Sequence, residues 1–385
     1  MDKDHALEEM MGKLGDFGRY QGFQFFLHIF AAMTAGMHML SLVTVAAVPE
    51  HRCFLPGIDG LNDTAPWNST LVLNSIPLNE HGKLESCIMY GVNNTVKECT
   101  SWVYNTQYFT SSRGIEWNFV CHQRWMGALA QTAYMFGVVA GSLIFGRISD
   151  KFGRKTAFVW SGLLQLILGT SVAFATDYYT FVAIRFLYGI FGSGSYIAGF
   201  VLTMEIVGPS KRTICGVMFQ IMFAVGIMLL AAWGYLIDNN RLLLQIVYGL
   251  HAAVLLPHFF LMDESPRWLW AQGRARESVA IIEKALNINN STTTVDTSAL
   301  VSHCKATCTK YTDEQSAGTS DLFKTPKMLK KTLIICGCWF TNSVVYYGLS
   351  LNTGKLNGNP YFIMFLMGVV ELPSYVIIMY FLDRI

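Results

Sequence analysis

The sequence predicts an all-α protein that crosses a membrane several times. Of its 385 residues, 52% are hydrophobic and only 14% are charged, which is too apolar for a soluble protein of this size. Eight apolar runs each have about the 20 residues that a helix needs to span a bilayer. Lys and Arg concentrate in alternate loops between these runs, as expected when those loops stay in the cytosol.

The runs divide the chain into six regions. The first 20 residues lack the short apolar core and the cleavage site of a signal peptide, so we expect a cytosolic N-terminus. The regions are 1–20, the N-terminus; 21–48, the first span; 49–124, an extracellular loop; 125–262, the second to sixth spans; 263–330, a cytosolic loop with helices; and 331–385, the seventh and eighth spans.

Loop charge agrees with this topology. The loops after the second, fourth and sixth runs hold four, two and, counted through Lys331, ten Lys or Arg residues, whereas position 177 and loop 238–242 hold none and one. The positive-inside rule therefore places the first group in the cytosol. We expect a multi-pass protein of the plasma membrane.

The extracellular region 49–124 is polar and rich in turn-forming residues. Three glycosylation sequons and four cysteines suit an oxidising, glycosylating lumen, so we expect two disulfides, for which four cysteines allow three connectivities. The sequons begin at Asn62, Asn68 and Asn93, and the cysteines are Cys53, Cys87, Cys99 and Cys121.

The loop at 263–330 contains helix signals. Ser265 followed by Pro266 is typical of a helix N-cap and first position, and Gly273 can end that helix. Val279, Ile282 and Leu286 then form an apolar stripe on a second helix. His303, Cys304 and Cys308 provide only three candidate ligands, so we predict reduced thiols and no metal site.

Several function classes are excluded by the sequence. No G-x-x-x-x-G-K-[ST] loop is present, so ATP-driven transport is unsupported. No loop combines a nucleophile with a base, so we predict no catalytic residues, no cofactor and no enzyme activity. A net charge of +2 does not favour nucleic-acid binding.

Charge inside the apolar runs is the main functional signal. Glu371 lies midway along the eighth run, where an acid costs about 2.5 to 3.5 kcal/mol on insertion scales, and Pro373 beside it frees a backbone carbonyl. Arg185 lies in the fourth run, with Glu205 at the inner end of that run. A structural ion pair remains the alternative for Glu371 and Arg185, and a protonated, buried acid is a further alternative for Glu371. Glu205, beside two cations, fits an ion pair of a gate.

Aromatic residues recur along the expected pathway. Rings beside a lone acid suit an organic cation, because each cation–π contact contributes about 0.5 to 2 kcal/mol. The rings belong to Tyr196, Trp339, Tyr346, Tyr347 and Tyr361, and Gln220 adds a polar group in the middle of a helix. Packing is the alternative for each of them.

The loop GRISDKFGRK at 146–155 resembles the loop that joins the second and third helices in the major facilitator superfamily. Further motifs resemble its organic ion branch, the organic cation and carnitine transporters. They are GIEWNFVC at 114–121, MEIVGPSKRT at 204–213, DESPRWLWAQGR at 263–274, DLFKTPKMLKKT at 321–332, YYGLSLN at 346–352 and ELPSY at 371–375. Asn118 stands where the family usually has Asp.

The resemblance implies a twelve-helix transporter of small organic cations or zwitterions that works by alternating access. Positions that match cavity residues of that family are Tyr196, Gln220, Trp339, Tyr346, Tyr361 and Glu371. Positions that match its inner gate are Asp150, Arg154, Lys155, Glu205, Arg212, Glu264 and Arg267, and we add Arg147 and Arg185 as conformational candidates.

The chain contains one complete six-helix unit and the first two helices of a second, so we expect an incomplete carrier that does not transport alone. Asp383, Arg384 and Ile385 follow the last run as Asp150 to Phe152 follow the second. Two alternatives stay open: an organic anion transporter, and a non-transporting chain that associates with a full-length relative. Expected partners are a small organic ion and the lipid bilayer; a coupling ion and an oligomer through the extracellular loop are left open.

Overall fold

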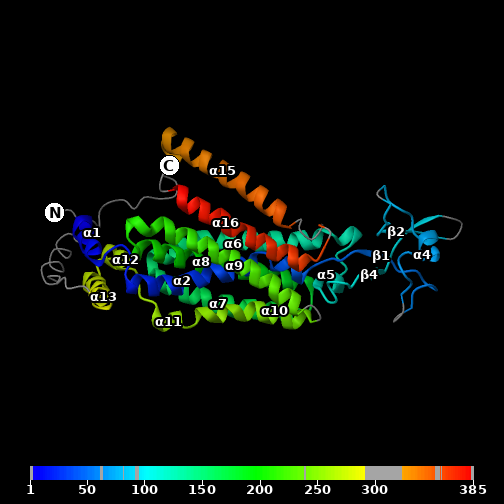
Figure 1. Ribbon diagram of the computed structural model, residues 1–385, viewed down its shortest axis with the longest axis horizontal. Coiled ribbons are helices and arrows are strands. Elements are labelled where there is room, and N and C mark those ends of the chain that lie inside the picture. Colours follow the sequence, from blue (N-terminus) through cyan, green and yellow to red (C-terminus); the bar gives the residue numbers. More distant parts are fainter. Residues whose placement is uncertain are drawn as a thin grey trace.

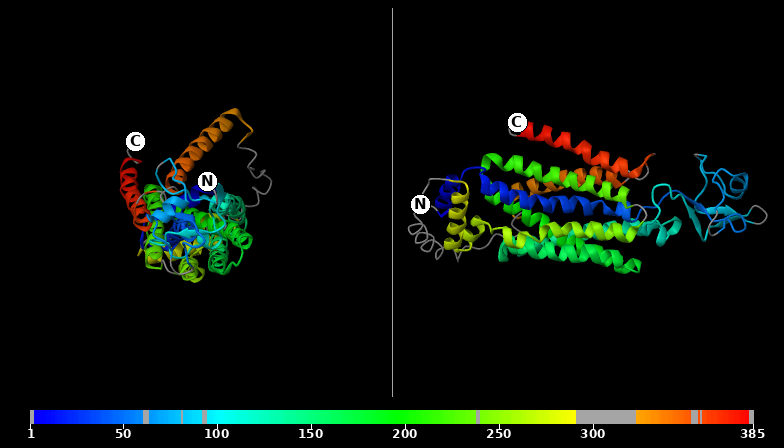
Figure 2. Two further views of the ribbon diagram at one scale, coloured as in Figure 1. Left: turned by 90° about the vertical axis from the view of Figure 1, so that its right-hand side faces the viewer. Right: turned by 60° about the horizontal axis from the view of Figure 1, so that its bottom comes forward.

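The computed structural model describes residues 3–60, 64–80, 82–91, 95–237, 240–290, 323–351, 356 and 358–382. Long helices run side by side along one axis, with a small lobe at one end and short helices at the other (Figures 1 and 2). We call these ends the lobe end and the α1 end. The N-terminus lies at the α1 end, so the first long helix, α2, runs towards the lobe (Figure 1).

The bundle is built mainly from long helices. Its helices are α2 Arg19–Met39, α3 Ser41–Val45, α6 Trp125–Phe152, α7 Arg154–Ser171, α8 Tyr178–Ile206, α9 Arg212–Leu236, α10 Arg241–Leu250, α11 His258–Leu261, α15 Pro326–Leu351 and α16 Pro360–Leu382. Short 3₁₀ helices at Cys121–Gln123, Val172–Phe174, Pro209–Lys211 and His251–Leu255 extend or link them.

Eight stretches of the described residues are long and apolar enough to cross a membrane, which confirms the predicted fold class. Two spans are less regular than their hydropathy suggests. The first changes direction at Leu40, between α2 and α3, and the sixth passes from α10 through a 3₁₀ turn and Pro257 into α11. Hydropathy reports burial in lipid but not helix continuity, so the sequence did not reveal these breaks.

Small residues bring the helices into close contact. A Cβ atom on Gly137 of α6 would overlap the carbonyl oxygen of Phe186 on α8, and one on Gly189 of α8 would overlap that of Tyr134. Such contacts let two backbones approach, which is how helices associate where lipid provides no hydrophobic driving force.

The last two long helices differ in how they join the bundle. α16 packs along α9, where a Cβ on Gly368 would lie 3.0 Å from the Ala224 carbonyl oxygen. The side chains of α15, in contrast, are largely exposed, and the helix diverges from the bundle towards the α1 end (Figure 1).

Three short helices cover the α1 end: α1 Lys3–Leu14, α12 Pro266–Ala271 and α13 Ala275–Ile288. The Ser265 hydroxyl accepts a hydrogen bond from the Trp268 N–H, as predicted for the N-cap of α12, and the stripe of Val279, Ile282 and Leu286 is buried. The helix α1 was not predicted. Its residues Leu7, Met10, Met11 and Leu14 are buried in the same core as α13.

The lobe contains the four-residue to six-residue helices α4 Thr70–Ser75 and α5 Arg113–Glu116 and two antiparallel strand pairs. Strand β1 His51–Cys53 pairs with β4 Trp102–Tyr104, and β2 Ile88–Tyr90 pairs with β3 Val96–Glu98. These short strands were not predicted within the all-α fold.

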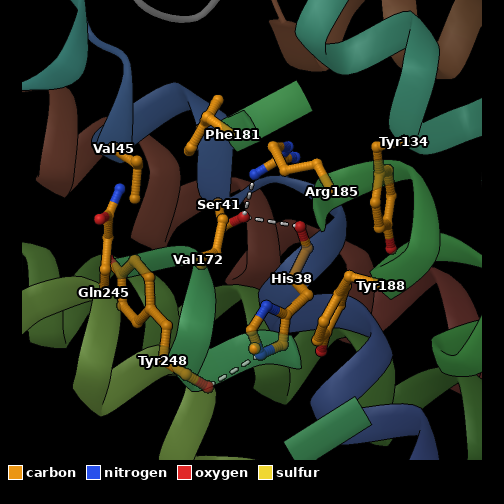
Figure 3. A pocket seen from close by; sticks show the side chains of 11 residues that line it. His38, Ser41, Val45, Tyr134, Val172, Phe181, Arg185, Tyr188, Gln245 and Tyr248 are labelled. Atoms are coloured by element: carbon orange, nitrogen blue, oxygen red, sulfur yellow. Dashed lines mark hydrogen bonds between the residues drawn. The ribbon is translucent and has the colours of Figure 1, made fainter. Parts of the chain in front are cut away.

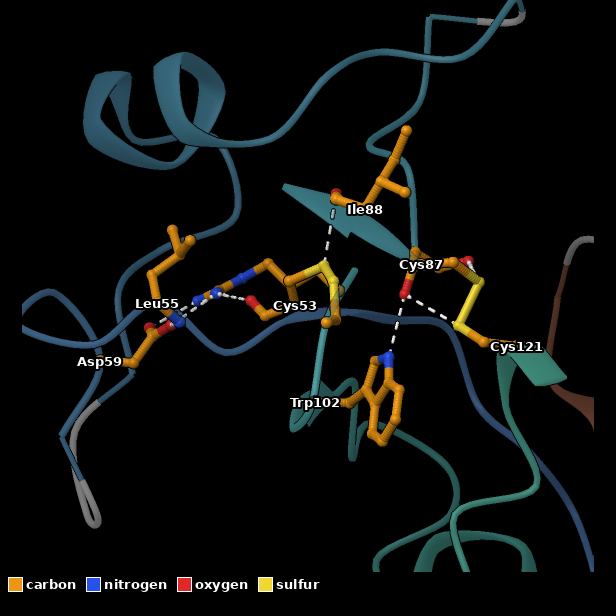
Figure 4. Close-up of a disulfide and its surroundings, with 10 residues drawn as sticks. Cys53, Leu55, Asp59, Cys87, Ile88, Trp102 and Cys121 are labelled. Carbon is orange, nitrogen blue, oxygen red and sulfur yellow. Dashed lines mark hydrogen bonds and ion pairs between the residues drawn. A yellow bond between two sulfur atoms is a disulfide. The ribbon is translucent and has the colours of Figure 1, made fainter. Parts of the chain in front are cut away.

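Two disulfides hold the lobe together, Cys53 with Cys99 and Cys87 with Cys121 (Figure 4). This is one of the three connectivities that the sequence allowed. The sequon residue Asn68 is exposed, two residues before the start of α4, whereas Asn62 and Asn93 fall outside the described residues.

Polar contacts anchor the lobe on the bundle. The Ser112 hydroxyl donates to the carbonyl of Ala47, and the buried Arg113 guanidinium donates to the carbonyl of Ala173 at the end of the third span. Glu116 pairs with Arg113 at 2.8 Å and with Arg241 at the start of α10 at 2.5 Å. The segment 112–116 therefore attaches the lobe to three different parts of the bundle.

A fully buried ion pair lies at the centre of the lobe. Arg52 donates two hydrogen bonds of 2.7 Å to the carboxylate of Asp59, which also accepts the backbone N–H groups of Leu55 and Ala65. The side-chain hydrogen bond from Arg52 is the main reason that the pKa of Asp59 falls to about 2, against the opposing effect of burial. The lobe is consequently stabilised by the ionised carboxylate.

We predict that the lobe loses stability as pH falls from about 4 to about 2. Because the folded pKa of Asp59 is depressed, its contribution of about 2 kcal/mol is complete above the unfolded pKa and disappears as pH falls through the folded one. Limited proteolysis of the lobe across this pH range measures the loss. The Asp59→Asn variant should be cleaved faster at pH 7 and show a weaker pH dependence; equal profiles for both proteins would contradict the prediction.

Candidate functional site

Two tyrosines hold the intramembrane acid Glu371. Tyr346 of α15 donates from its hydroxyl to Glu371 Oε1 at 2.9 Å, and Tyr375, one turn further along α16, donates to Oε2 at 3.1 Å. Both carboxylate oxygens therefore have a neutral donor. No ion pair joins Glu371 to a cation among the residues that the structure describes.

Tyr375 was missed by the sequence reasoning, although a signal was present. It lies four residues after Glu371, and side chains at that spacing on a helix are neighbours. A tyrosine at this spacing from a buried acid is a natural hydrogen-bond donor to it.

A second polar pair lies on α8 and α9. The Gln220 amide donates to the Tyr196 hydroxyl at 3.2 Å, and the Tyr196 ring packs edge-on against Phe219. The predicted residues Tyr196, Gln220, Tyr346 and Glu371 thus form two hydrogen-bonded pairs, one between α8 and α9 and one between α15 and α16.

Two predicted cavity residues lie elsewhere. Trp339 on α15 is 70% exposed, so it does not join this group. Tyr361 lies at the lobe end of α16, ten residues or roughly 15 Å from Glu371, and its hydroxyl donates to the Tyr108 carbonyl of the lobe region. The location of Tyr361 follows from its position along α16, which sets how far it lies from Glu371. The exposure of Trp339 follows from the packing of α15.

Arg185 of α8 is buried beside neutral groups (Figure 3). Its guanidinium donates to the Ser41 hydroxyl and to the Gln131 side-chain oxygen, both at 3.3 Å, and lies near the rings of Tyr134 and Phe181. The structural ion pair that was one of two alternatives for Arg185 is not present among the described residues. The sequence could not show this, because ion pairs form between helices that are distant in the chain.

A network of charges lies at the α1 end. The Arg154 guanidinium bonds Glu205 at 3.1 Å and Asp150 at 3.0 Å, and it also donates to the Ser149 carbonyl. These contacts link the end of α6, the start of α7 and the end of α8. Glu205 thus forms an ion pair with Arg154, and its role in a gate stays a prediction.

Glu264 caps the start of α7. Its carboxylate accepts the backbone N–H groups of Arg154, at 2.9 Å, and of Lys155, at 3.1 Å, so it satisfies donors that lack a partner within the helix and lies at the positive end of the helix dipole. Burial raises the pKa of Glu264, and these N–H donors, with that of Ser265, oppose the rise.

Gly153 is required for this contact. It separates α6 from α7 with a φ of +105°, which side-chain-bearing residues rarely adopt, and a Cβ atom there would overlap Glu264 Oε2. The turn between α6 and α7 is therefore tight at Gly153, where the Glu264 carboxylate directly approaches the backbone.

Arg267 extends the network to the N-terminal helix. It donates to the Glu205 carbonyl at 3.0 Å and forms an ion pair with Glu8 of α1. Glu8 was not predicted, although the apolar spacing of the residues around it indicates a helix. Of the remaining residues predicted for the gate, Arg212 donates a hydrogen bond to the Val207 carbonyl at 3.3 Å. Lys155 contributes its backbone N–H to Glu264, and the side chain of Arg147 is exposed.

Comparison with known proteins identifies the family. A model of the sugar (and other) transporter family matches residues 84–385. The chain is 35% identical to the organic cation transporter protein of Drosophila melanogaster over 401 residues, which covers 98% of this chain and 71% of that protein. The chain belongs to the organic ion branch of the major facilitator superfamily.

Further relatives agree with this assignment. The chain is 31% identical to solute carrier family 22 member 1 of Oryctolagus cuniculus, with 99% of this chain and 72% of that protein covered. The structure of the xylose transporter XylE from E. coli matches with a TM-score of 0.57 at 12% identity, covering 95% of this chain and 74% of that one, which shows a shared fold. The organic ion branch consists of membrane transporters and not of enzymes, so a small organic solute and lipid are its general partners.

For this member of the superfamily, we predict that Gly153→Ala destabilises the α1 end. The unfavourable φ costs about 1 to 3 kcal/mol, and the new methyl group displaces Glu264 from its N–H donors. Thermal unfolding in detergent measures the effect as a lower midpoint. Gly146→Ala is the matched control, because a Cβ atom there meets nothing within 4 Å; equal midpoints for the two variants would refute the assigned role of Gly153.

Proposed function

We propose that this chain belongs to a carrier that moves small organic cations or zwitterions, of the carnitine type, across the plasma membrane by alternating access. Glu371 is the counter-charge of the substrate. The proposal is supported mainly by one observation: the Glu371 carboxylate lies in a membrane-spanning helix, contacted by two tyrosine hydroxyls and by no cation of the described residues.

The chemistry of this group fits a cationic substrate. A carboxylate inside a bilayer is stable only next to a cavity, water or a positive partner. Aromatic rings attract a cation through their faces, so Tyr346 and Tyr375 can flank an ammonium group that replaces the missing partner. Gln220 provides a hydrogen bond for a polar group on the same solute.

The names of the relatives point in the same direction. Two Drosophila melanogaster proteins that match 98% of this chain are called an organic cation transporter protein and a beta-alanine transporter, at 35% and 31% identity. The first name supports cations and the second supports zwitterions, which carry the same ammonium group.

The network at the α1 end is proposed as the inner gate. It links the end of α6, the start of α7, the end of α8 and the helices α1 and α12. With a cytosolic N-terminus, this network faces the cytosol and the lobe faces outward. Breaking and re-forming exposed ion pairs such as that of Asp150, which is 76% exposed, requires little free energy, as a cycling gate needs.

Two alternatives make different predictions. An organic anion transporter would bind an anionic solute independently of Glu371. A non-transporting chain that associates with a full-length relative would co-purify with that relative and bind no solute by itself.

We predict that Glu371→Gln weakens binding of tetraethylammonium by about ten- to hundred-fold, because a contact to an ionised group contributes about 1.5 to 3 kcal/mol. Tyr375→Phe removes one neutral donor and should weaken binding less. Equilibrium binding of the labelled cation to the purified chain measures both effects, and uptake by cells expressing the chain tests transport.

The matched control is Glu277→Gln, which removes an exposed acid on α13 that, in the described part of the chain, pairs with Arg274 alone. Its cation binding should equal that of the unmodified chain. Binding of an organic anion such as p-aminohippurate that survives Glu371→Gln, without cation binding, would favour the anion alternative. Absence of any solute binding by a folded chain would rule out the carrier proposal for it.

A further inference from the structure

A small cavity lies next to Arg185 in the lobe-end half of the bundle. Its volume is about 20 Å³, and it lies between α2, α3, α7, α8 and α10, lined among others by His38, Ser41, Arg185, Gln245 and Tyr248 (Figure 3). Arg185 is seven residues from the start of α8, or roughly 10 Å along the helix axis, so the cavity lies within the membrane-spanning part of the chain.

The hydrogen-bonding capacity of Arg185 is only partly used. Its two terminal nitrogens each have one neutral acceptor, Ser41 and Gln131, but the Nε–H group is buried without a partner. A buried guanidinium is strongly unfavourable without a compensating negative charge, since neutral acceptors replace water but not a counter-ion.

Acids of the surrounding helices do not provide that charge. Among the described residues of α2, α3, α6, α7, α8 and α10, the acids are Asp150 and Glu205, which both belong to the network at the α1 end. Glu205 is twenty residues from Arg185 on the same helix, or roughly 30 Å away. Glu116, at the lobe end, already neutralises Arg113 and Arg241.

A second unpaired donor lines the same cavity. The side-chain oxygen of the buried Gln245 accepts a long hydrogen bond of 3.5 Å from Arg113, and this orientation leaves its amide nitrogen without a partner. Arg185 and Gln245 therefore bring a positive charge and two unpaired N–H donor groups to one small space, where an acceptor with negative charge is the complementary ligand.

We propose that this cavity binds a chloride-sized monovalent anion, which neutralises Arg185 and accepts hydrogen bonds from Arg185 and Gln245. A volume of about 20 Å³ admits a single ion or water molecule and excludes an organic solute. The site is separate from the Glu371 group, and its existence does not depend on the transport proposal.

Thermal unfolding of the purified chain in detergent tests the site. Sodium chloride is titrated against sodium gluconate at constant ionic strength, because gluconate is too large for the cavity. We expect the unfolding midpoint to rise by a few degrees with chloride and to saturate, as for any ligand that binds only the folded state. In Arg185→Gln, the midpoint should be the same in both salts, whereas the exposed-surface control Arg276→Gln should keep the full chloride response.

A second variant keeps the test decisive if Arg185→Gln does not fold. Ser41→Asp places a carboxylate next to the Arg185 nitrogen that Ser41 contacts at 3.3 Å, so the protein supplies its own counter-ion. We expect a folded protein without chloride dependence. Equal midpoints of the unmodified chain in chloride and gluconate, or a full chloride response in Ser41→Asp, would overturn the proposal.

Discussion

Polar groups between membrane-spanning helices need partners inside the protein, because hydrocarbon provides none. This constraint orders the whole structure. At the α1 end, Glu264 satisfies the first N–H groups of α7 and Arg154 neutralises Glu205. At the lobe end, Glu116 neutralises two arginines. Between these ends lie the two charges without an opposite partner among the described residues, Glu371 and Arg185, and both proposed ligand sites centre on them.

Much of the fold could be predicted from the sequence, because the signals are local. Long apolar runs identify the eight spans, and the Ser265–Pro266 pair with the stripe of Val279, Ile282 and Leu286 identifies two helices of the following loop. Pairings were not predictable in this way. The choice of Cys53 with Cys99, for example, depends on how the strands of the lobe fold over one another.

The candidate site was predictable only in part, for the same reason. Glu371 is conspicuous in the sequence because a charge in an apolar run is expensive, but aromatic residues are common in this chain and carry little information singly. Trp339 and Tyr346 are on one helix, yet only Tyr346 reaches the acid. Whether a residue contacts the acid depends on which face of the helix it occupies. The direction of that face is known only when the neighbouring helices are known.

The contact between Tyr361 and the Tyr108 carbonyl gives the lobe a mechanical connection to α16. Ser112 and Arg113 attach the same lobe to the first six spans, so it bridges the two groups of helices outside the membrane-spanning region. Tilting of α16 relative to those spans would strain or break this bridge. A nanobody that binds the lobe and the end of α16 at the same time would therefore fix the two groups of helices in one arrangement without entering the bundle.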